Sequence, residues 1–127
     1  MILVQPQDLA NVWPKVVGWI ESAIEHGQGD ENALDVLIAI ARGQYLLFHE
    51  PGKFALVGQI QTFPRQKIAM VLYCGGGDLL AIKKSFDDMQ PWCKSNGIAA
   101  IRVWGRQGWE RVLDLTRKGM ILQMEIV

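Results

Sequence analysis

Residues 67–79 have the sequence KIAMVLYCGGGDL. The run from Lys67 to Cys74 is almost continuously apolar, which is typical of a strand covered on both faces of a sheet. Three glycines follow, and Asp78 then precedes a segment with helical period, where aspartate is a favoured N-cap. This part of the chain predicts a buried strand that turns tightly into a helix beginning near Leu79.

The segment after the glycines has the clearest helical pattern in the chain. Its apolar residues recur at steps of three and four, namely at Leu79, Ile82, Phe86, Met89 and Cys93. Asn96-Gly97 is a typical helix end. Pro91 should kink the last turn, because proline has no backbone N–H to donate. We therefore expect a long amphipathic helix packed on the preceding strand.

The chain before residue 67 divides into two helices and further strands. Helical spacing predicts helices over about 8–26 and 30–42, the first with its main part beginning near Pro14 and the second capped by Asp30. Proline-containing turns then separate three apolar runs, at 44–50, 53–62 and 66–74. Such runs predict consecutive antiparallel strands, with the third as the central one.

The chain after residue 97 predicts three further elements. They are a short strand at 98–104, a helix at 107–118 closed by Gly119, and an alternating strand at 120–127. No linker or internal repeat interrupts this order. We therefore expect a single domain spanning 1–127.

The composition excludes several classes of protein. The 127 residues carry 13 basic and 13 acidic side chains, and this balance argues against a nucleic-acid partner. No apolar stretch is long enough to cross a membrane. Two cysteines and two histidines make neither a disulfide framework nor a metal set, so we expect a reducing compartment and no metal site.

The charges are unevenly distributed along the chain. Residues 1–50 carry two basic and seven acidic side chains, whereas residues 102–127 carry five basic and three acidic ones. A partner surface would produce such an asymmetry, and so would helices with solvated faces. The sequence leaves both interpretations open.

The order of these elements resembles the Gcn5-related N-acetyltransferase (GNAT) fold. In that family the fourth strand ends at a glycine-rich loop that binds the pyrophosphate of CoA, and residues 73–79 would hold that place here. The resemblance implies an α/β (α+β) fold, with a mixed, mostly antiparallel twisted sheet and helices on both faces. The short first strand of many members would be Ile2–Gln5.

A second resemblance concerns the sequence GRQGWERVL at 105–113, together with WCKSNG at 92–97. Both are similar to segments of small GNAT-like proteins of tailed bacteriophages and prophages. This resemblance implies a phage-encoded protein that is present in the host cytoplasm during expression. It further implies a role in the virion, with phage structural proteins as partners.

The glycine loop is the candidate cofactor-binding site, formed by Cys74, Gly75, Gly76, Gly77 and Asp78. Backbone N–H groups at a helix N-terminus attract a pyrophosphate. The loop lacks the Arg or Gln of the usual family signature, however, and the Asp78 carboxylate would repel an anion. A tight structural turn would use the same glycines. Both interpretations stay open.

Catalytic groups are scarce in the sequence. Many family members protonate the leaving thiolate with a tyrosine in the last helix, and Leu115 stands at that place here. Tyr73, at the end of the strand that precedes the glycine loop, is the candidate catalytic residue, and a buried aromatic is the alternative interpretation. Cys93 lies on the apolar face of its helix and is expected in the core.

Arginine and tryptophan gather near the C-terminus, at Arg102, Trp104, Arg106, Trp109 and Arg111. These residue types are enriched at binding hot spots. One interpretation places Trp109 in the core and pairs the arginines with the acidic first two helices. The others are a protein partner, or contact with CoA or nucleic acid.

The sequence favours a non-catalytic, phage-encoded GNAT-like protein that acts as a virion or assembly component through protein contacts, without a cofactor. The alternative is an acetyl-CoA-dependent N-acyltransferase. A third hypothesis is an adaptor or inhibitor that binds a host protein.

Overall fold

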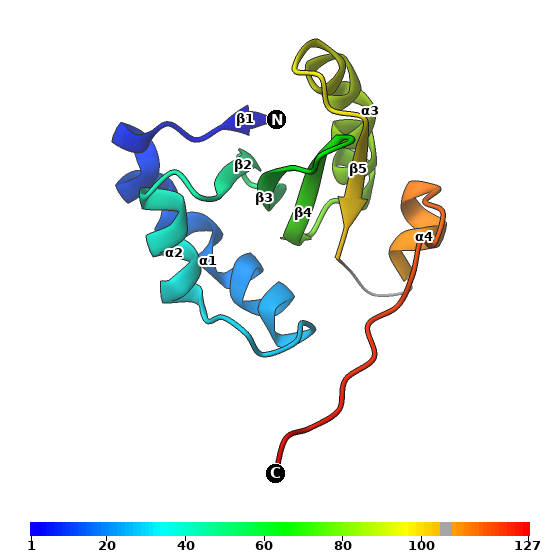
Figure 1. Ribbon diagram of the computed structural model, residues 1–127. Helices are drawn as coiled ribbons and strands as arrows, with labels where there is room; N and C mark the ends of the chain where they lie inside the picture. The colour runs from blue at the N-terminus through cyan, green and yellow to red at the C-terminus, as the bar shows by residue number, and fades with distance from the viewer. Residues whose placement is uncertain (105–107) are drawn as a thin grey trace.

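A five-stranded sheet forms the centre of the computed structural model, which describes residues 1–104 and 108–127 (Figure 1). The strands lie in the order of the sequence: β1 (Ile2–Leu3), β2 (Leu46–Glu50), β3 (Phe54–Thr62), β4 (Lys67–Gly76) and β5 (Ala100–Val103). The first four are antiparallel neighbours, and β5 is parallel to β4. The sheet is therefore mixed and mostly antiparallel, as the sequence predicts, and β1 supplies the short first strand.

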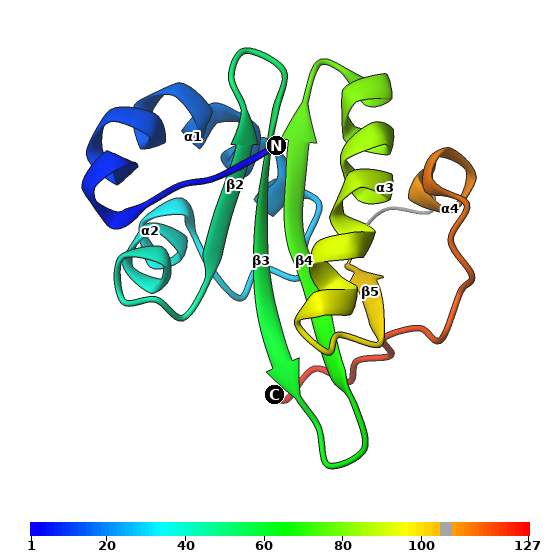
Figure 2. The same ribbon diagram turned by 90° about the horizontal axis from the view of Figure 1, so that it is seen from above.

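Helices cover both faces of this sheet (Figure 2). On one face lie α1 (Leu9–Glu25), which follows the short 3₁₀ helix η1 (Pro6–Asp8), and α2 (Ala33–Ala41). On the other face lie α3 (Leu79–Ser95) and α4 (Gly108–Leu113). The α/β architecture with two covered faces confirms the predicted fold class.

The sheet divides the apolar core into two clusters. Since successive side chains of a strand point to opposite faces, Phe54 and Leu56 of β3 pack against α3, whereas Ala55 and Val57 pack against α1 and α2. The run at 66–74 was predicted to be the central strand, but the middle strand of the sheet is β3. The reason is that residues 120–127, which were predicted to add a strand, pair with no strand of the described structure, so only β5 lies beyond β4.

Three predictions of helix ends have different outcomes. The first helix begins at Leu9, so Pro14 lies inside it rather than near its start. The second helix is capped by Asn32 and not by Asp30, because Asn32 and Asp35 form a reciprocal capping box at 2.9 and 3.0 Å. Asp78 is the N-cap of α3 as predicted, and its carboxylate accepts the Ala81 N–H at 2.9 Å.

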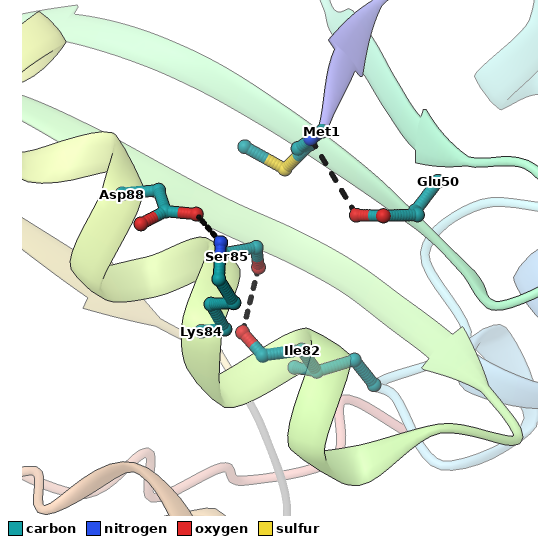
Figure 3. A network of polar contacts seen from close by, with 6 residues as sticks. All are labelled: Met1, Glu50, Ile82, Lys84, Ser85 and Asp88. Atoms are coloured by element: carbon teal, nitrogen blue, oxygen red, sulfur yellow. Dashed lines mark hydrogen bonds and ion pairs between the residues drawn. The ribbon is translucent and has the colours of Figure 1, made fainter.

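Polar side chains of α3 form hydrogen bonds and an ion pair within the helix itself (Figure 3). The buried Ser85 hydroxyl donates to the Ile82 carbonyl at 2.6 Å, and Lys84 pairs with Asp88 at 2.8 Å on the exposed side. Nearby, the amino group of Met1 lies 3.5 Å from the Glu50 carboxylate. The Ser85 hydroxyl is thus part of the helix and offers no nucleophile to a ligand.

The C-terminal part differs from the sequence prediction. Helix α4 ends at Leu113, well before Lys118, and Asp114 follows it with a φ of +54°, a common way to stop a helix. Residues 120–127 pair with no strand in the part of the chain that the structure describes, although an alternating strand was predicted there. The pattern is suited to a strand, but a strand also needs a neighbour that supplies its hydrogen bonds.

None of the helices in the described residues is both long enough and apolar enough to cross a membrane.

Candidate functional site

A β-bulge at Leu72 interrupts the pairing of β3 with β4. Val57 lies opposite Tyr73, yet the next residue, Gly58, lies opposite Val71, so Leu72 is an extra residue on β4. One extra residue reverses the alternation of side chains that follows it. As a consequence Val71 and Cys74 pack against α3, whereas the Tyr73 side chain points to the face covered by α1 and α2.

The bulge coincides with the end of pairing between β4 and β5. The register covers Ile68–Val71 of β4, and the Trp104 N–H then donates to the Val71 carbonyl at 3.0 Å. Beyond this point no described strand pairs with that edge of β4. The backbone of 72–76 therefore presents an open edge, while its other edge stays paired with β3.

Close packing explains why two of the three positions after the bulge are occupied by glycine. A Cβ at Gly75 would lie 2.6 Å from the Trp19 carbonyl oxygen of α1, and a Cβ at Gly76 would lie 2.5 Å from Phe54 of β3. Both contacts are shorter than packed atoms allow. Gly77 has open space around it, but its N–H donates to the Lys53 carbonyl at 3.1 Å. The turn is thus built by contacts within the chain.

Three polar side chains meet on the face of the sheet that is covered by α1 and α2. We call them the carboxylate cluster: Glu31, Tyr45 and Tyr73. The Tyr73 hydroxyl donates to one carboxylate oxygen of Glu31 at 2.7 Å, and the Tyr45 hydroxyl donates to the other at 2.8 Å. Glu31 lies in the loop between α1 and α2, and Tyr45 directly precedes β2. All three are half-buried.

Burial and the Glu31 charge keep both tyrosines protonated. Burial is the main cause that raises the pKa of Tyr45 to about 12, and the hydrogen bond to Glu31 adds to it. The pKa of Tyr73 is raised further, for the same reasons in the same order. Two neutral hydroxyls therefore hold the Glu31 carboxylate in one orientation, which leaves its remaining lone pairs for another donor.

Glu31 lines two adjacent surface hollows. One, of about 570 Å³, lies between α2 and the sheet and includes Tyr45, Arg42 and Gln59 in its lining. The other, of about 430 Å³, lies between the end of α1 and the start of α2 and includes Glu21 and Glu25. A ligand in either hollow would meet the Glu31 carboxylate.

The sequence identified one member of this cluster and missed the other two. Tyr73 was singled out for its place at the end of the strand, but its hydroxyl contacts Glu31 rather than a group in the loop that follows β4. No sequence pattern indicated Glu31 or Tyr45 as functional residues, because they lie 42 and 28 positions before Tyr73 and belong to no spaced motif.

The arginine–tryptophan residues do not share one environment. Trp109 is half-buried and packs against the core cluster of α3, whereas Trp104 is 50% exposed. The Arg102 guanidinium lies 5.7 Å from the centre of the Phe63 ring, in cation–π contact. Arg111 is exposed, and Arg106 lies outside the described residues.

The predicted pairing of these arginines with the acidic helices is not found in the described part of the chain. Its three ion pairs join Met1 to Glu50, Lys84 to Asp88 and Arg117 to Glu110. None of them links residues 1–50 with residues 102–127.

Neither a metal site nor a reactive thiol is present among the described residues. No group of three potential metal ligands occurs there. Cys74 and Cys93 are both buried, and burial raises the pKa of Cys74 to about 12 and also raises that of Cys93. Their thiols therefore stay protonated and inert at neutral pH.

The fold of this chain is similar to the folds of solved acetyltransferases. A probable acetyltransferase superposes with a TM-score of 0.69 at 8% identity, covering 99% of this chain and 97% of its own. A ribosomal-protein-alanine N-acetyltransferase from Brucella melitensis biovar Abortus 2308 gives 0.64 at 9% identity, covering 98% of both chains. The fold is GNAT-like.

A further neighbour is an aminoglycoside acetyltransferase from an uncultured soil metagenomic sample, solved with sisomicin. It gives a TM-score of 0.63 at 10% identity and covers 99% of this chain and 93% of its own. No protein-family model and no curated protein sequence matches the chain. At these identities the likeness is one of GNAT-like fold, and it extends over nearly the whole chain.

Proposed function

We propose that this protein is an acyltransferase that moves an acyl group from a CoA thioester to an amine. The observation that carries the proposal is the bulge at Leu72: pairing with β5 stops there, which leaves one edge of β4 open, and Tyr73 next to the bulge points to Glu31 on the face covered by α1 and α2. A thioester along the open edge and an amine at Glu31 would then approach Tyr73 from different sides. The acetyltransferase neighbours support this activity over a purely structural role.

The open edge of β4 suits the pantetheine arm of the donor. An extended arm with two amides adds to a strand edge as a peptide does, through backbone N–H and carbonyl groups. Residues 72–76 offer such groups on the side away from β3. We assign the acyl-pantetheine part of the donor to this edge.

The glycine turn suits the pyrophosphate less well. The Gly77 N–H already donates to the Lys53 carbonyl, and the Asp78 carboxylate caps the N-terminus of α3. A negative charge there offsets the attraction of the helix N-terminus for an anion. The nucleotide end of CoA therefore contributes little to binding, and most of the affinity comes from the arm.

The carboxylate cluster takes the proton of the acceptor. The amine nitrogen forms a bond with the carbonyl carbon of the thioester, its proton passes to Glu31, and the carbon–sulfur bond breaks. The departing thiolate takes a proton from water, since Leu115 stands where a tyrosine acid would be expected. Tyr45 and Tyr73 keep the Glu31 oxygens in place throughout.

The test is thiol release from acetyl-CoA in the presence of a panel of primary amines. The wild type should release thiol faster with an accepted amine than without one. Glu31→Gln should lower kcat about 100-fold, the usual contribution of a general base. Glu21→Gln is the matched control, because Glu21 lines the neighbouring hollow but contacts neither tyrosine, and it should keep most of the activity.

A binding measurement separates the donor from the acceptor. Acetyl-CoA at 100 times its Kd should stabilise the wild type by about 2.7 kcal/mol in thermal unfolding. If acetyl-CoA gives no shift and no amine supports thiol release, the acyltransferase proposal is wrong. Equal activity of Glu31→Gln and wild type would remove Glu31 from the mechanism.

The hypothesis of a phage origin and a virion or assembly role stays a prediction. It was based on the sequences 105–113 and 92–97, and residues 105–107 lie outside the described residues. A host-binding adaptor stays a prediction as well. Exposed Arg102 and Trp104 would serve either role as contact residues.

A further inference from the structure

The hollow between α2 and the sheet has opposite charges at its two ends. Its volume of about 570 Å³ is in the range of small-molecule sites. The α2 residues that line it follow the spacing i, i+3, i+4 and i+7, which puts them on one face of the helix: Asp35, Ile38, Ala39 and Arg42. The acidic Glu31 and Asp35 lie at the start of α2, whereas Arg42 is its C-cap. One end of the hollow is therefore negative and the other positive.

The positive end has an arginine that forms no ion pair within the described part of the chain. The three ion pairs found there join other residues. Arg42 is exposed, and the neighbouring lining residue on the sheet side is Gln44, which is uncharged. A guanidinium presents its N–H donors in a planar fork that fits a carboxylate. This end of the hollow is therefore suited to an anionic group of a ligand.

The remaining lining of the hollow adds a hydrogen-bond donor and an apolar surface. The side-chain oxygen of Gln59 on β3 accepts a hydrogen bond from Gln61 at 3.1 Å, so the Gln59 NH₂ group is the part that can donate to a ligand. On the helix side, Ile38 lies between Asp35 and Arg42 in the sequence and is 39% exposed. A ligand that joins the two ends would meet a donor for a carbonyl oxygen and an apolar contact.

The length of α2 sets the separation of the two charged ends. Asp35 and Arg42 are seven positions apart, which corresponds to about 10 Å along a helix that rises 1.5 Å per residue. An extended peptide spans about 3.5 Å per residue, so two or three residues cover about 7 to 10 Å. A single amino acid is too short to reach both ends of the hollow.

We propose that the acceptor is a free peptide of two or three residues, whose α-amine reaches Glu31 and whose C-terminal carboxylate binds Arg42. This inference rests on the acyltransferase function proposed above and names its acceptor. An inner carbonyl of the peptide accepts a hydrogen bond from Gln59. The ordinary pKa of a peptide α-amine is about 8, against about 10.4 for a lysine amine, so part of it is neutral at pH 7 and able to attack the thioester.

Calorimetric titration without acetyl-CoA tests the site by binding alone. Trialanine should bind about 10- to 100-fold more tightly than its C-terminal amide, which corresponds to one hydrogen bond to a charged group. An ω-amino acid with as many bonds between its charges as a tripeptide has no inner amide, so it should bind more weakly than trialanine. Equal affinity of trialanine for either comparison ligand would overturn the proposal.

Substitution of Arg42 tests which residue recognises the carboxylate. Arg42→Gln should bring the affinities for trialanine and its amide to about the same value, because the charge that distinguishes them is lost. Arg42→Lys should keep part of the difference, since it keeps the charge but not the fork. Arg65→Gln is the matched control, because Arg65 lies between β3 and β4 and lines neither hollow, and it should keep the full difference. A full difference in Arg42→Gln would contradict the assignment.

Thiol release from acetyl-CoA separates this inference from the function on which it rests. The KM for trialanine should be about 10- to 100-fold below that for its amide, with similar kcat, because the carboxylate lies away from the reacting atoms. If simple amines support thiol release but trialanine and its amide give equal KM values, the peptide acceptor is wrong and the acyltransferase stands. If trialanine binds as expected but no amine supports thiol release, the acyltransferase is wrong and the peptide site stands.

Discussion

The glycine turn at the end of β4 (residues 75–77) and the carboxylate cluster flank the same bulge but are held by different forces. In the turn, Gly75 and Gly76 let the backbones of α1 and β3 approach where any side chain would collide. In the cluster, Glu31 is held by two hydroxyls from distant parts of the chain and borders open hollows. One region is filled by the protein itself, and the other is left accessible to a ligand.

This difference shows that a conspicuous motif and a functional group need not coincide. Three consecutive glycines attract attention in a sequence, yet two of them serve packing and the third donates to a backbone carbonyl. Glu31 is one of several acidic residues in the N-terminal part. It becomes a candidate functional group only because two tyrosine hydroxyls orient its carboxylate.

The turn should be the region that is most sensitive to substitution. Gly76→Ala would place a methyl group against Phe54 and the Lys53 carbonyl and should destabilise the fold by about 3 kcal/mol or more, or prevent folding. Gly77→Ala is the matched control, since nothing lies near its Cβ position, and it should cost less than about 1 kcal/mol. Urea unfolding measures both, and equal losses would contradict the packing argument.

The cluster should tolerate change better than the turn. Tyr73→Phe removes one hydrogen bond to the Glu31 carboxylate and should cost about 1 to 2 kcal/mol in the same urea unfolding. Activity should fall at the same time, because the carboxylate loses one of its two fixed contacts. A variant that unfolds as completely as Gly76→Ala would show that Tyr73 serves the core rather than the cluster.

The loss of folding stability at alkaline pH should depend on the tyrosines. A raised pKa means that Tyr45 binds its proton more tightly in the folded state than in the unfolded state, where the pKa is 10.0. The stability from this group is therefore complete below pH 10 and is lost as pH rises toward 12. Tyr45→Phe should show a flatter decline across this window in pH-dependent unfolding. Cys74 titrates in both proteins, so the difference belongs to Tyr45, and superimposable curves would contradict the assignment.

The smallest expected effect concerns the charge at the turn. Asp78→Asn keeps a good N-cap and should leave stability nearly unchanged. Removing the carboxylate should lower the Kd for acetyl-CoA about fivefold, because it removes repulsion of the phosphates. Acetyl-pantetheine, which has no pyrophosphate, is the control ligand and should bind as before. An equal change for both ligands would mean that Asp78 does not act through charge.

Much of the fold could be predicted because it follows from local patterns. The helical period after Leu79 and the aspartate before it gave α3 and its cap. The proline-containing turns gave β2, β3 and β4 in antiparallel order. The start of α1 was wrong, because a helix can continue through Pro14 when the residues before it also favour a helix.

The C-terminal strand shows the limit of a local pattern. The alternation at 120–127 predicted a strand, and this prediction was wrong, although the side chains of Gln123 and Glu125 lie on one side. A strand nevertheless exists only when another strand completes its hydrogen bonds. Whether a partner is present is not encoded in the segment itself.

The sequence by itself determined the order of helices and strands up to β5 and the cap of α3, since periodicity and turn residues act over a few positions. The resemblance to the GNAT fold rested on that order. Only the tertiary structure decided what surrounds the bulge. A single extra residue at Leu72 turned Tyr73 to the other face, where it met Glu31 from 42 positions away. Contacts over such separations depend on the register of the sheet and the packing of helices on it, and no local pattern records either.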